Sequence, residues 1–386
     1  MDDHHYKYEG GRACMNPVWP CAMTGAVSCL SGFDDLGIVI HGSSGCFFYP
    51  ATIISRPLSC TFLVEEEIIM GTEERLSETI SEALEHFSKV AVVNTCVPSV
   101  IGEDLHSMNV PEGVFFVDSP GFLGNFENGH RIAIEALNPL VDNNRTGVNI
   151  EGVTQFDPFH KGNLMEAKRL LSLSGINTAT VFSGGSVSDI EKCSDYTIGT
   201  NPDLRGAPGK FAGGLLGISE VRSTFKFLSE KLDDPDTDPL FRECDKAEEM
   251  IDKVCDKYLR KFNPPRVAVF GFSGYSCKVA EILRRSLDVD IAAIGQRNAG
   301  VCGDSSYNIR DACDIRSISG IIEESTPDLI IGSSYERALA PGLPFVGITP
   351  PLRGIISLHS CPLCGIEGEL WLIESVLNAC MANNPQ

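Results

Sequence analysis

The sequence lacks the positive charge that a nucleic-acid-binding protein needs. Its 31 Lys and Arg residues are outnumbered by 52 Asp and Glu residues, and the formal net charge is −21. Phosphate backbones are bound by clustered cations, so we expect no nucleic acid among its partners. No window approaches the ~20 consecutive apolar residues that cross a bilayer, and the polar start MDDHHYKYEGGR has no apolar signal core. These absences predict a cytoplasmic protein without a membrane partner.

Motifs for nucleotide binding are also missing. GAPGKF (residues 206–211) has neither the spacing of a Walker A loop nor the Ser or Thr that follows its lysine. FGFSGYS (residues 270–276) is a glycine-rich turn after an apolar run, but it does not fit GxGxxG and lacks the acidic residue of a dinucleotide fold. We therefore expect that this chain binds no ATP itself. The His residues have no spacing typical of a catalytic triad, so the catalytic residues stay unknown.

Short β-branched runs alternate with amphipathic segments of helix length. This alternation predicts an α/β fold of parallel sheets covered by helices on both faces. The strands form three groups, which predict three doubly wound, Rossmann-like domains at residues 1–143, 144–262 and 263–386. The charged stretch 223–265 predicts two helices and a connector. The expected strands are 37–41, 90–95, 114–118, 147–152, 178–182, 195–199, 266–271, 289–294, 328–332 and 344–348.

Cysteine, by contrast, is abundant, with 15 residues. In a cytoplasmic chain, and more so in an anaerobic cell, this content indicates thiols, metal ligands or redox chemistry rather than a disulfide framework. Cys46 and Cys96 each follow an apolar strand, and Cys21 lies in a Pro-interrupted loop. Functional groups of a parallel sheet collect beyond the carboxyl ends of its strands. Each cysteine alone also fits a small core residue, but the set predicts an iron–sulfur site built from loop thiolates.

Five segments within the first 125 residues form a distinctive set. They are PCAMTGAVSCLSGFDDLGIVIHGSSGCFFY (20–49), RPLSC (56–60), IIMGTEERL (68–76) and NTCVPSVIGEDL (94–105), followed by DSPGFLGN (118–125). Together they resemble the component 1 proteins of the nitrogenase family. The resemblance implies that Cys21, Cys46 and Cys96 ligate an iron–sulfur cluster, 4Fe-4S in type, which receives electrons from an ATP-dependent iron protein. It also implies a homodimer, or a heterodimer with a related component 1 subunit.

The fourth ligand is left open by this resemblance. In the family the cluster lies near a subunit interface, so the ligand could come from another chain, from Cys14 or from Cys60. Cys60 is also explained simply as a buried strand residue. Gly121 stands where one nitrogenase subunit has a serine near its cluster, so that extra ligand is missing here.

Two departures from the family concern the substrate. The turn DYTIGTNPDLRG (195–206) has Thr200 or its neighbours where the dinitrogen-reducing subunit holds its large cofactor with a cysteine, and segment 348–371 lacks the expected histidine. We therefore expect a nitrogenase-like oxidoreductase that reduces another substrate in the cleft between domains. A tetrapyrrole is one candidate, because the chain length approaches that of the catalytic subunit of nickel-sirohydrochlorin a,c-diamide reductive cyclase. The alternatives are a metal-cluster or cofactor assembly scaffold without turnover, and a small-molecule-binding α/β protein without a cluster.

One CxxC motif lies in this last segment, within HSCPLCG (359–365). The spacing is typical of a metal or dithiol site, and two incidental thiols before the final helix explain it equally well. If the motif is functional, we expect Arg353, His359, Cys361 and Cys364 to face the substrate cleft, where Arg353 could bind a carboxylate.

Overall fold

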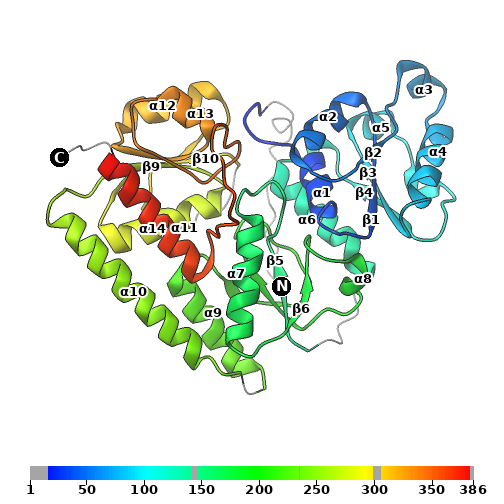
Figure 1. Ribbon diagram of the computed structural model, residues 1–386. Helices are drawn as coiled ribbons and strands as arrows, with labels where there is room; N and C mark the ends of the chain where they lie inside the picture. Colours follow the sequence, from blue (N-terminus) through cyan, green and yellow to red (C-terminus); the bar gives the residue numbers. More distant parts are fainter. Residues whose placement is uncertain (1–15, 141–145, 234, 299–305, 383–386) are drawn as a thin grey trace. The chain divides into compact units, whose positions relative to one another are not determined.

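The computed structural model describes residues 16–140, 146–233, 235–298 and 306–382 (Figure 1). Its residues divide into two compact units. Unit 1 comprises Met1–Ser31 and Asp35–Ala136, and unit 2 comprises Gly32–Asp34 and Leu137–Gln386. Cys14, one of the possible fourth ligands, lies outside the described residues.

Unit 1 contains a four-stranded parallel sheet with the order β2-β1-β3-β4. The two central strands are buried on both faces, which explains why they read as continuous apolar runs. The strands are β1 (Leu36–His41), β2 (Ser59–Cys60), β3 (Lys89–Asn94) and β4 (Val114–Asp118). The helices are α1 (Ala22–Leu30), α2 (Ser44–Ile53), α3 (Glu65–Met70), α4 (Glu73–Leu84), α5 (Cys96–Ile101) and α6 (Phe126–Leu137).

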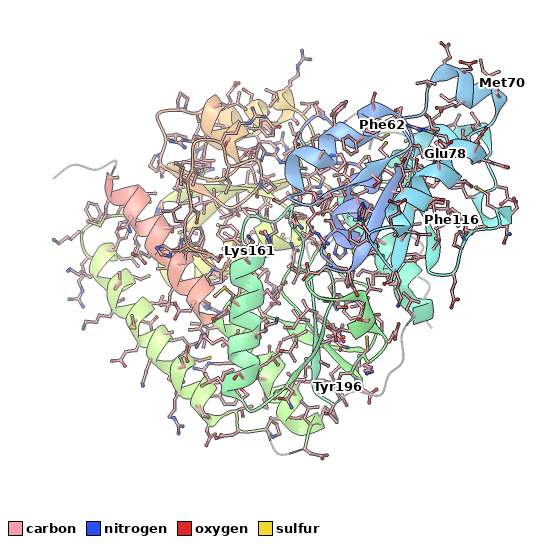
Figure 2. The ribbon with its side chains drawn as sticks, turned by 45° about the vertical axis from the view of Figure 1, so that its right-hand side comes forward. Phe62, Met70, Glu78, Phe116, Lys161 and Tyr196 are labelled. Atoms are coloured by element: carbon pink, nitrogen blue, oxygen red, sulfur yellow. The ribbon has the colours of Figure 1, made fainter. Side chains whose placement is uncertain are left out.

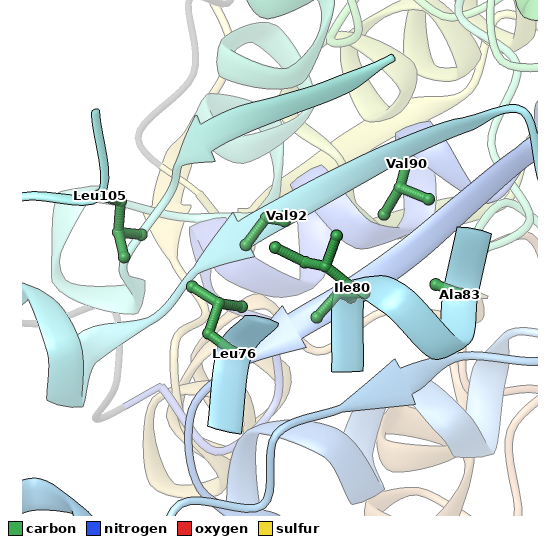
Figure 3. Packing of buried hydrophobic residues seen from close by; sticks show 7 residues of the cluster. Leu76, Ile80, Ala83, Val90, Val92 and Leu105 are labelled. Atoms are coloured by element: carbon green, nitrogen blue, oxygen red, sulfur yellow. The ribbon is translucent and has the colours of Figure 1, made fainter. Parts of the chain in front are cut away.

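One face of this sheet is covered by α4. Leu76, Ile80 and Ala83 recur at helical spacing and pack on Val90 and Val92 of β3, all at most 5% exposed (Figure 3). Burying a side chain of the size of Leu, Ile or Val contributes about 1.5–3 kcal/mol. This layer therefore holds β1 and β3 in place behind the turns that follow them.

Close contact between α1 and α6 positions the start of α1. A Cβ on Gly25 would lie 1.9 Å from the Phe126 carbonyl oxygen, and a Cβ on Gly129 would lie 1.6 Å from the Ala22 carbonyl oxygen. Only glycine at these two positions lets the helix backbones touch. All nine residues of α1 are buried, so Cys21, the residue before it, is held rigidly.

Unit 2 contains two parallel sheets, of orders β6-β5-β7-β8 and β11-β10-β9-β12-β13. The strands are β5 (Val148–Glu151), β6 (Thr178–Val181), β7 (Tyr196–Gly199), β8 (Lys210–Gly214), β9 (Arg266–Gly271), β10 (Asp290–Gln296), β11 (Ile309–Asp311), β12 (Leu329–Gly332) and β13 (Phe345–Gly347). The helices are α7 (His160–Leu173), α8 (Val187–Ile190), α9 (Ile218–Lys231), α10 (Asp238–Leu259), α11 (Ser273–Leu287), α12 (Ile315–Ser325), α13 (Ser334–Leu339) and α14 (Gly365–Ala382).

The α/β class with parallel sheets is confirmed, and so are the expected strands and the two helices α9 and α10 of the charged stretch. Three short strands were missed. β2 has two residues, β11 has three, and β8 reads KFAGG, which lacks the β-branched residues that mark a strand. The three-domain boundaries stay a prediction: each predicted range contains one sheet, whereas the division by contacts gives two units. No helix in the described ranges is long and apolar enough to cross a membrane.

Candidate metal centre

The strand order of the first sheet reverses between β1 and β3, because β2 lies on one side of β1 and β3 on the other. In open parallel sheets, ligands bind beyond the carboxyl ends of the strands at such a reversal. Cys46 lies in the first turn of α2 after β1, and Cys96 is the first residue of α5 after β3. The two strands pair up to their last residues, His41 and Asn94. The two cysteine turns therefore leave the sheet side by side.

Cys21 is brought to the same edge by the loop after β4. It forms an isolated bridge with Asn125, flanked by hydrogen bonds from the Ala22 N–H to the Gly124 carbonyl (2.9 Å) and from the Phe126 N–H to the Pro20 carbonyl (3.0 Å). Its backbone is extended, with φ −83° and ψ 174°. The cysteine thus lies at the N-terminus of α1, against a loop that begins at the end of β4.

The thiols of Cys21 and Cys96 lie close enough to Cys46 to act on its pKa. Burial raises the pKa of the Cys46 thiol, and the Cys96 and Cys21 thiols raise it further, whereas the hydroxyls of Thr95 and Ser43 lower it. None of the three cysteines forms a disulfide, and all three are half-buried. The structure therefore brings together Cys21, Cys46 and Cys96, the cysteines that the sequence singled out.

Gly42 leaves room for the side chain of Thr95. A Cβ at this position would lie 2.1 Å from the Thr95 Oγ1 atom and 3.0 Å from the Thr95 Cβ atom. Thr95 is fully buried directly before Cys96, and its Oγ1 atom has no hydrogen-bond partner within the described residues. The glycine after His41 is thus required because the turns that carry Cys46 and Cys96 touch at this point.

Cys60 is placed differently. Its side chain is 6% exposed, its thiol faces the Gly42 carbonyl at 3.7 Å, and its sulfur accepts the Phe62 N–H at 3.4 Å. Burial raises the pKa of this thiol to about 11. Cys60 is therefore satisfied within the protein, which agrees with its description as a buried strand residue.

The side-chain chemistry of the three cysteines fits an iron–sulfur cluster. Within the described residues no group of three or more His, Cys, Asp or Glu side chains is placed to hold one metal ion. A cluster of several iron atoms accepts thiolates that are further apart, and thiolates are its usual ligands. At the same sheet edge, Asn94 Oδ1 and Ser119 Oγ are buried with no hydrogen-bond partner in the described part of the chain. Such orphaned polar atoms are typical of a site that receives another group.

A buried histidine behind the cysteines was missed by the sequence analysis. His41 places Nε2 3.0 Å from Glu103 Oε2 and Nδ1 3.3 Å from Thr61 Oγ1, and the Thr72 hydroxyl also bonds to Glu103. Burial lowers the pKa of His41, and Glu103 opposes this shift. His41 in HGSSGC and Glu103 in IGED stand near two cysteines in the sequence, but nothing in their spacing predicts a pairing across the sheet.

Apolar side chains on the same helices are exposed. Phe48 on α2 is 62% exposed and Val100 on α5 is 74% exposed. Phe62, labelled in Figure 2, is 40% exposed and stacks edge-on against Phe47 at 4.9 Å between ring centroids. Its φ of 49° lies in the left-handed region, which is unfavourable for a bulky residue. Exposed apolar side chains mark a protein contact surface where they form one contiguous patch.

The glycine-rich turn FGFSGYS is occupied by the protein itself. The N–H groups of Gly274 and Tyr275 donate to the two carboxylate oxygens of Asp203 at 2.8 and 3.0 Å, and the Ser273 N–H donates to Asn298 Oδ1 at 3.2 Å. These are the donors that a phosphate would use at the N-terminus of α11. The turn therefore holds an internal anion.

The predicted cleft residues lie in unit 2 and are not brought into one cluster. Arg353 and His359 are on an exposed loop, and Cys361 is half-buried. Cys364 is fully buried: its N–H donates to Asn163 Oδ1 at 3.0 Å, and burial raises the pKa of its thiol well above the usual range. Cys361 and Cys364 thus differ in environment. Cys277 on α11 is disulfide-bonded, unlike these free thiols.

Asp157 in unit 2 predicts a measurable pH dependence of stability. Its fully buried carboxylate accepts the Tyr275 hydroxyl at 2.7 Å and the Phe159 N–H at 2.8 Å, and burial raises its pKa to about 6 from 3.8. Between pH 4 and 6 the folded state then binds more protons than the unfolded state. The contribution of Asp157 is therefore complete below pH ~4 and lost as the pH rises through ~6.

We expect the free energy of unfolding of the wild type, measured relative to Asp157→Asn, to fall across this window and to level off above it. Urea unfolding of both proteins at a series of pH values measures the difference. A difference that rises with pH would contradict the raised pKa.

Comparison with known proteins agrees with this architecture. The family described as nitrogenase component 1 type oxidoreductase matches residues 21–199 and 204–381. The nitrogenase molybdenum-iron protein beta chain of Frankia alni is 22% identical, over 94% of this chain and 82% of its own length. The nitrogenase iron-molybdenum cofactor biosynthesis protein NifE of Clostridium pasteurianum is 29% identical, over 44% of this chain and 41% of its own length. A solved structure of nitrogenase Cp1 at pH 6.5 superposes with a TM-score of 0.82 at 19% identity, covering 96% of this chain and 93% of its own. The chain therefore belongs to the nitrogenase component 1 type oxidoreductases.

Proposed function

We propose that this chain accepts electrons from an ATP-dependent iron protein through an iron–sulfur cluster held by Cys21, Cys46 and Cys96, and reduces a substrate other than dinitrogen. The observation that supports the proposal is the convergence of three half-buried cysteines, none of them in a disulfide, at the strand-order reversal of the first sheet. A cluster bound there would supply one-electron transfer at low potential. The three thiols bind it, and the rigid N-terminus of α1 and the paired ends of β1 and β3 orient them.

The ligand count supports a second subunit. A 4Fe-4S cluster usually has four thiolates, and Cys60 is engaged with Gly42 and Phe62. We propose that the missing ligand comes from a second component 1 subunit, identical or related. The exposed apolar side chains Phe48 and Val100, on the two helices that carry Cys46 and Cys96, provide surface for such a contact.

The turn after β7 supports the exclusion of dinitrogen. Thr200 is fully buried, and its hydroxyl donates to the Glu151 carbonyl at 3.0 Å. This position, where the resemblance led us to look for a cysteine ligand, therefore has no soft donor for a metal. A tetrapyrrole remains a candidate substrate.

A scaffold for cofactor assembly is the second candidate function. The observation that favours it is the 29% identity with NifE, a protein named for cofactor biosynthesis, although this covers only 44% of the chain. A scaffold would hold its metal group and pass it on, whereas a reductase would turn over substrate.

One anaerobic preparation tests both functions. We expect iron and sulfide to copurify, and the cluster signal in the EPR spectrum to change on addition of a cognate iron protein and ATP. Because Asp203 occupies the N-terminus of α11, ATP hydrolysis should require the iron protein. Oxidation of the reduced cluster by an added tetrapyrrole supports a reductase, whereas transfer of metal to an acceptor protein supports a scaffold. A colourless, iron-free protein would contradict both.

The two cysteines of the CxxC motif are expected to respond differently to mutation. Cys361 is half-buried and is the thiol that a substrate can reach, so Cys361→Ser should leave the iron content unchanged and lower turnover by about tenfold, or ~1.4 kcal/mol. Cys364→Ser should instead lower the melting temperature, because it replaces a fully buried thiol. Turnover assays and thermal unfolding on both variants measure this. Unchanged turnover in Cys361→Ser would show that its thiol is incidental.

A further inference from the structure

The loop after β4 touches the candidate centre through its backbone. Gly121 is buried and begins a short 3₁₀ helix, Gly121–Leu123. Its N–H donates to the Cys96 Sγ atom at 3.0 Å. The loop is fixed on both sides of this contact, by the Leu123 N–H to Pro120 carbonyl bond at 3.0 Å and by the bridge between Asn125 and Cys21.

A hydrogen bond of this kind acts on both the position and the charge of a ligand. An N–H donor aimed at a thiolate stabilises its negative charge. A reduced iron–sulfur cluster carries one electron more than the oxidised form, so the donor stabilises the reduced form more. Hydrogen bonds to the sulfurs are accordingly one of the factors that set cluster potentials.

We propose that the main-chain N–H of Gly121 is a positioning group for Cys96, and that it raises the reduction potential of the cluster. This inference rests on the proposed function, because Cys96 must be a ligand for the donor to act. The donor is a main-chain group, so the residue type at position 121 gives no sign of this contact. It follows only from the position of the loop after β4 relative to the start of α5.

Proline at position 121 removes this donor and is compatible with the backbone conformation before it. Pro120 has φ −61° and ψ 146°, which is the conformation that a residue before proline prefers. The first position of a helix also tolerates proline, since its N–H has no partner within the helix. Gly121→Ala is the matched control, because it adds a side-chain carbon and keeps the N–H.

The primary experiment is a redox titration, followed by EPR, of the wild type, Gly121→Pro and Gly121→Ala, with iron content measured on each. We expect full iron content in all three and a more negative midpoint for Gly121→Pro alone. Equal midpoints in the two variants at full iron content would overturn this inference and leave the three-cysteine assignment intact. A wild type without iron would overturn both.

A second measurement covers the case in which Gly121→Pro fails to fold or to assemble a cluster. Wild type labelled with [¹⁵N]glycine should show a ¹⁵N coupling to the cluster spin in pulsed EPR. The same labelling of Gly121→Ala should remove that coupling, because the residue is now unlabelled, and should keep the coupling of an exchangeable proton. A ¹⁵N coupling that is absent from the wild type, or unchanged in Gly121→Ala, would overturn the inference.

Discussion

Cys46→Ala is expected to lose the iron–sulfur cluster while the apoprotein keeps its fold. Cys21 and Cys96 both raise the pKa of the Cys46 thiol. Removal of Cys46 therefore leaves only two of the three candidate ligands. The fold should persist because α2 contributes little to the core, with only Pro50 buried among its residues. Because the Cys46 side chain is only half-buried, we expect the free energy of unfolding of Cys46→Ala to differ from that of the wild type by no more than about 1 kcal/mol.

The measurements are iron and sulfide content after anaerobic purification, together with urea unfolding of the metal-free protein. Cys60→Ala is the matched control, because Cys60 lies next to Cys46 at the same sheet edge and is bonded within the protein. It should keep its iron. Full iron content in Cys46→Ala would contradict the ligand assignment, whereas loss of iron in Cys60→Ala would make Cys60 the fourth ligand.

Arg297→Met is expected to cost about 3–5 kcal/mol of stability, because it leaves a buried carboxylate without its cation. Arg297 and Glu336 form an ion pair whose side chains are both 0% exposed. Arg297 also donates to the Ala312 carbonyl at 2.9 Å and to Ser333 Oγ at 3.2 Å. Glu336 accepts the Ser333 N–H at 2.8 Å and its hydroxyl at 2.7 Å.

The double variant Arg297→Met/Glu336→Leu should recover part of this loss, since it removes both buried charges together. Recovery is incomplete because Ser333, the N-cap residue of α13, loses the carboxylate that accepts its N–H. Denaturant unfolding of the wild type, the two single variants and the double variant gives the coupling free energy directly. A stability of Arg297→Met equal to that of the wild type would show that the pair does not hold the loops after β10 and β12 together.

Variants of the ion pair also serve as a control that distinguishes loss of stability from loss of the cluster. Arg297 and Glu336 belong to unit 2, whereas the three cysteines belong to unit 1. Arg297→Met that still folds at low temperature should therefore keep its iron, and Cys46→Ala should keep its stability. Loss of iron in folded Arg297→Met would indicate that the cluster site depends on unit 2.

Much of the fold could be predicted because strand and helix signals are local. β1 and β3 are buried on both faces and read as continuous apolar runs, and α4 shows its core face in the spacing of Leu76, Ile80 and Ala83. β8 was missed because its Lys210 and two glycines carry no such signal. Its place at the sheet edge is given by pairing with β7, which is a tertiary contact.

The sequence by itself determined which thiols stand at strand ends, since an apolar run followed by a Gly- or Thr-containing turn marks where the chain leaves a sheet. Only the tertiary structure decided which of these ends are neighbours. β1 pairs with β3 along its full length although more than 50 residues separate Leu36 from its partner Lys89 along the chain, and this pairing places Cys46 beside Cys96.

The same limit applies to every contact that the sequence analysis missed. His41 with Glu103, Asp203 with the turn at Gly274, and the N–H of Gly121 with Cys96 each join segments that are distant in sequence. Residue type and spacing report whether a side chain is apolar, flexible or ionisable. They do not report which distant backbone group will satisfy it, because that depends on strand order and helix packing across the whole unit.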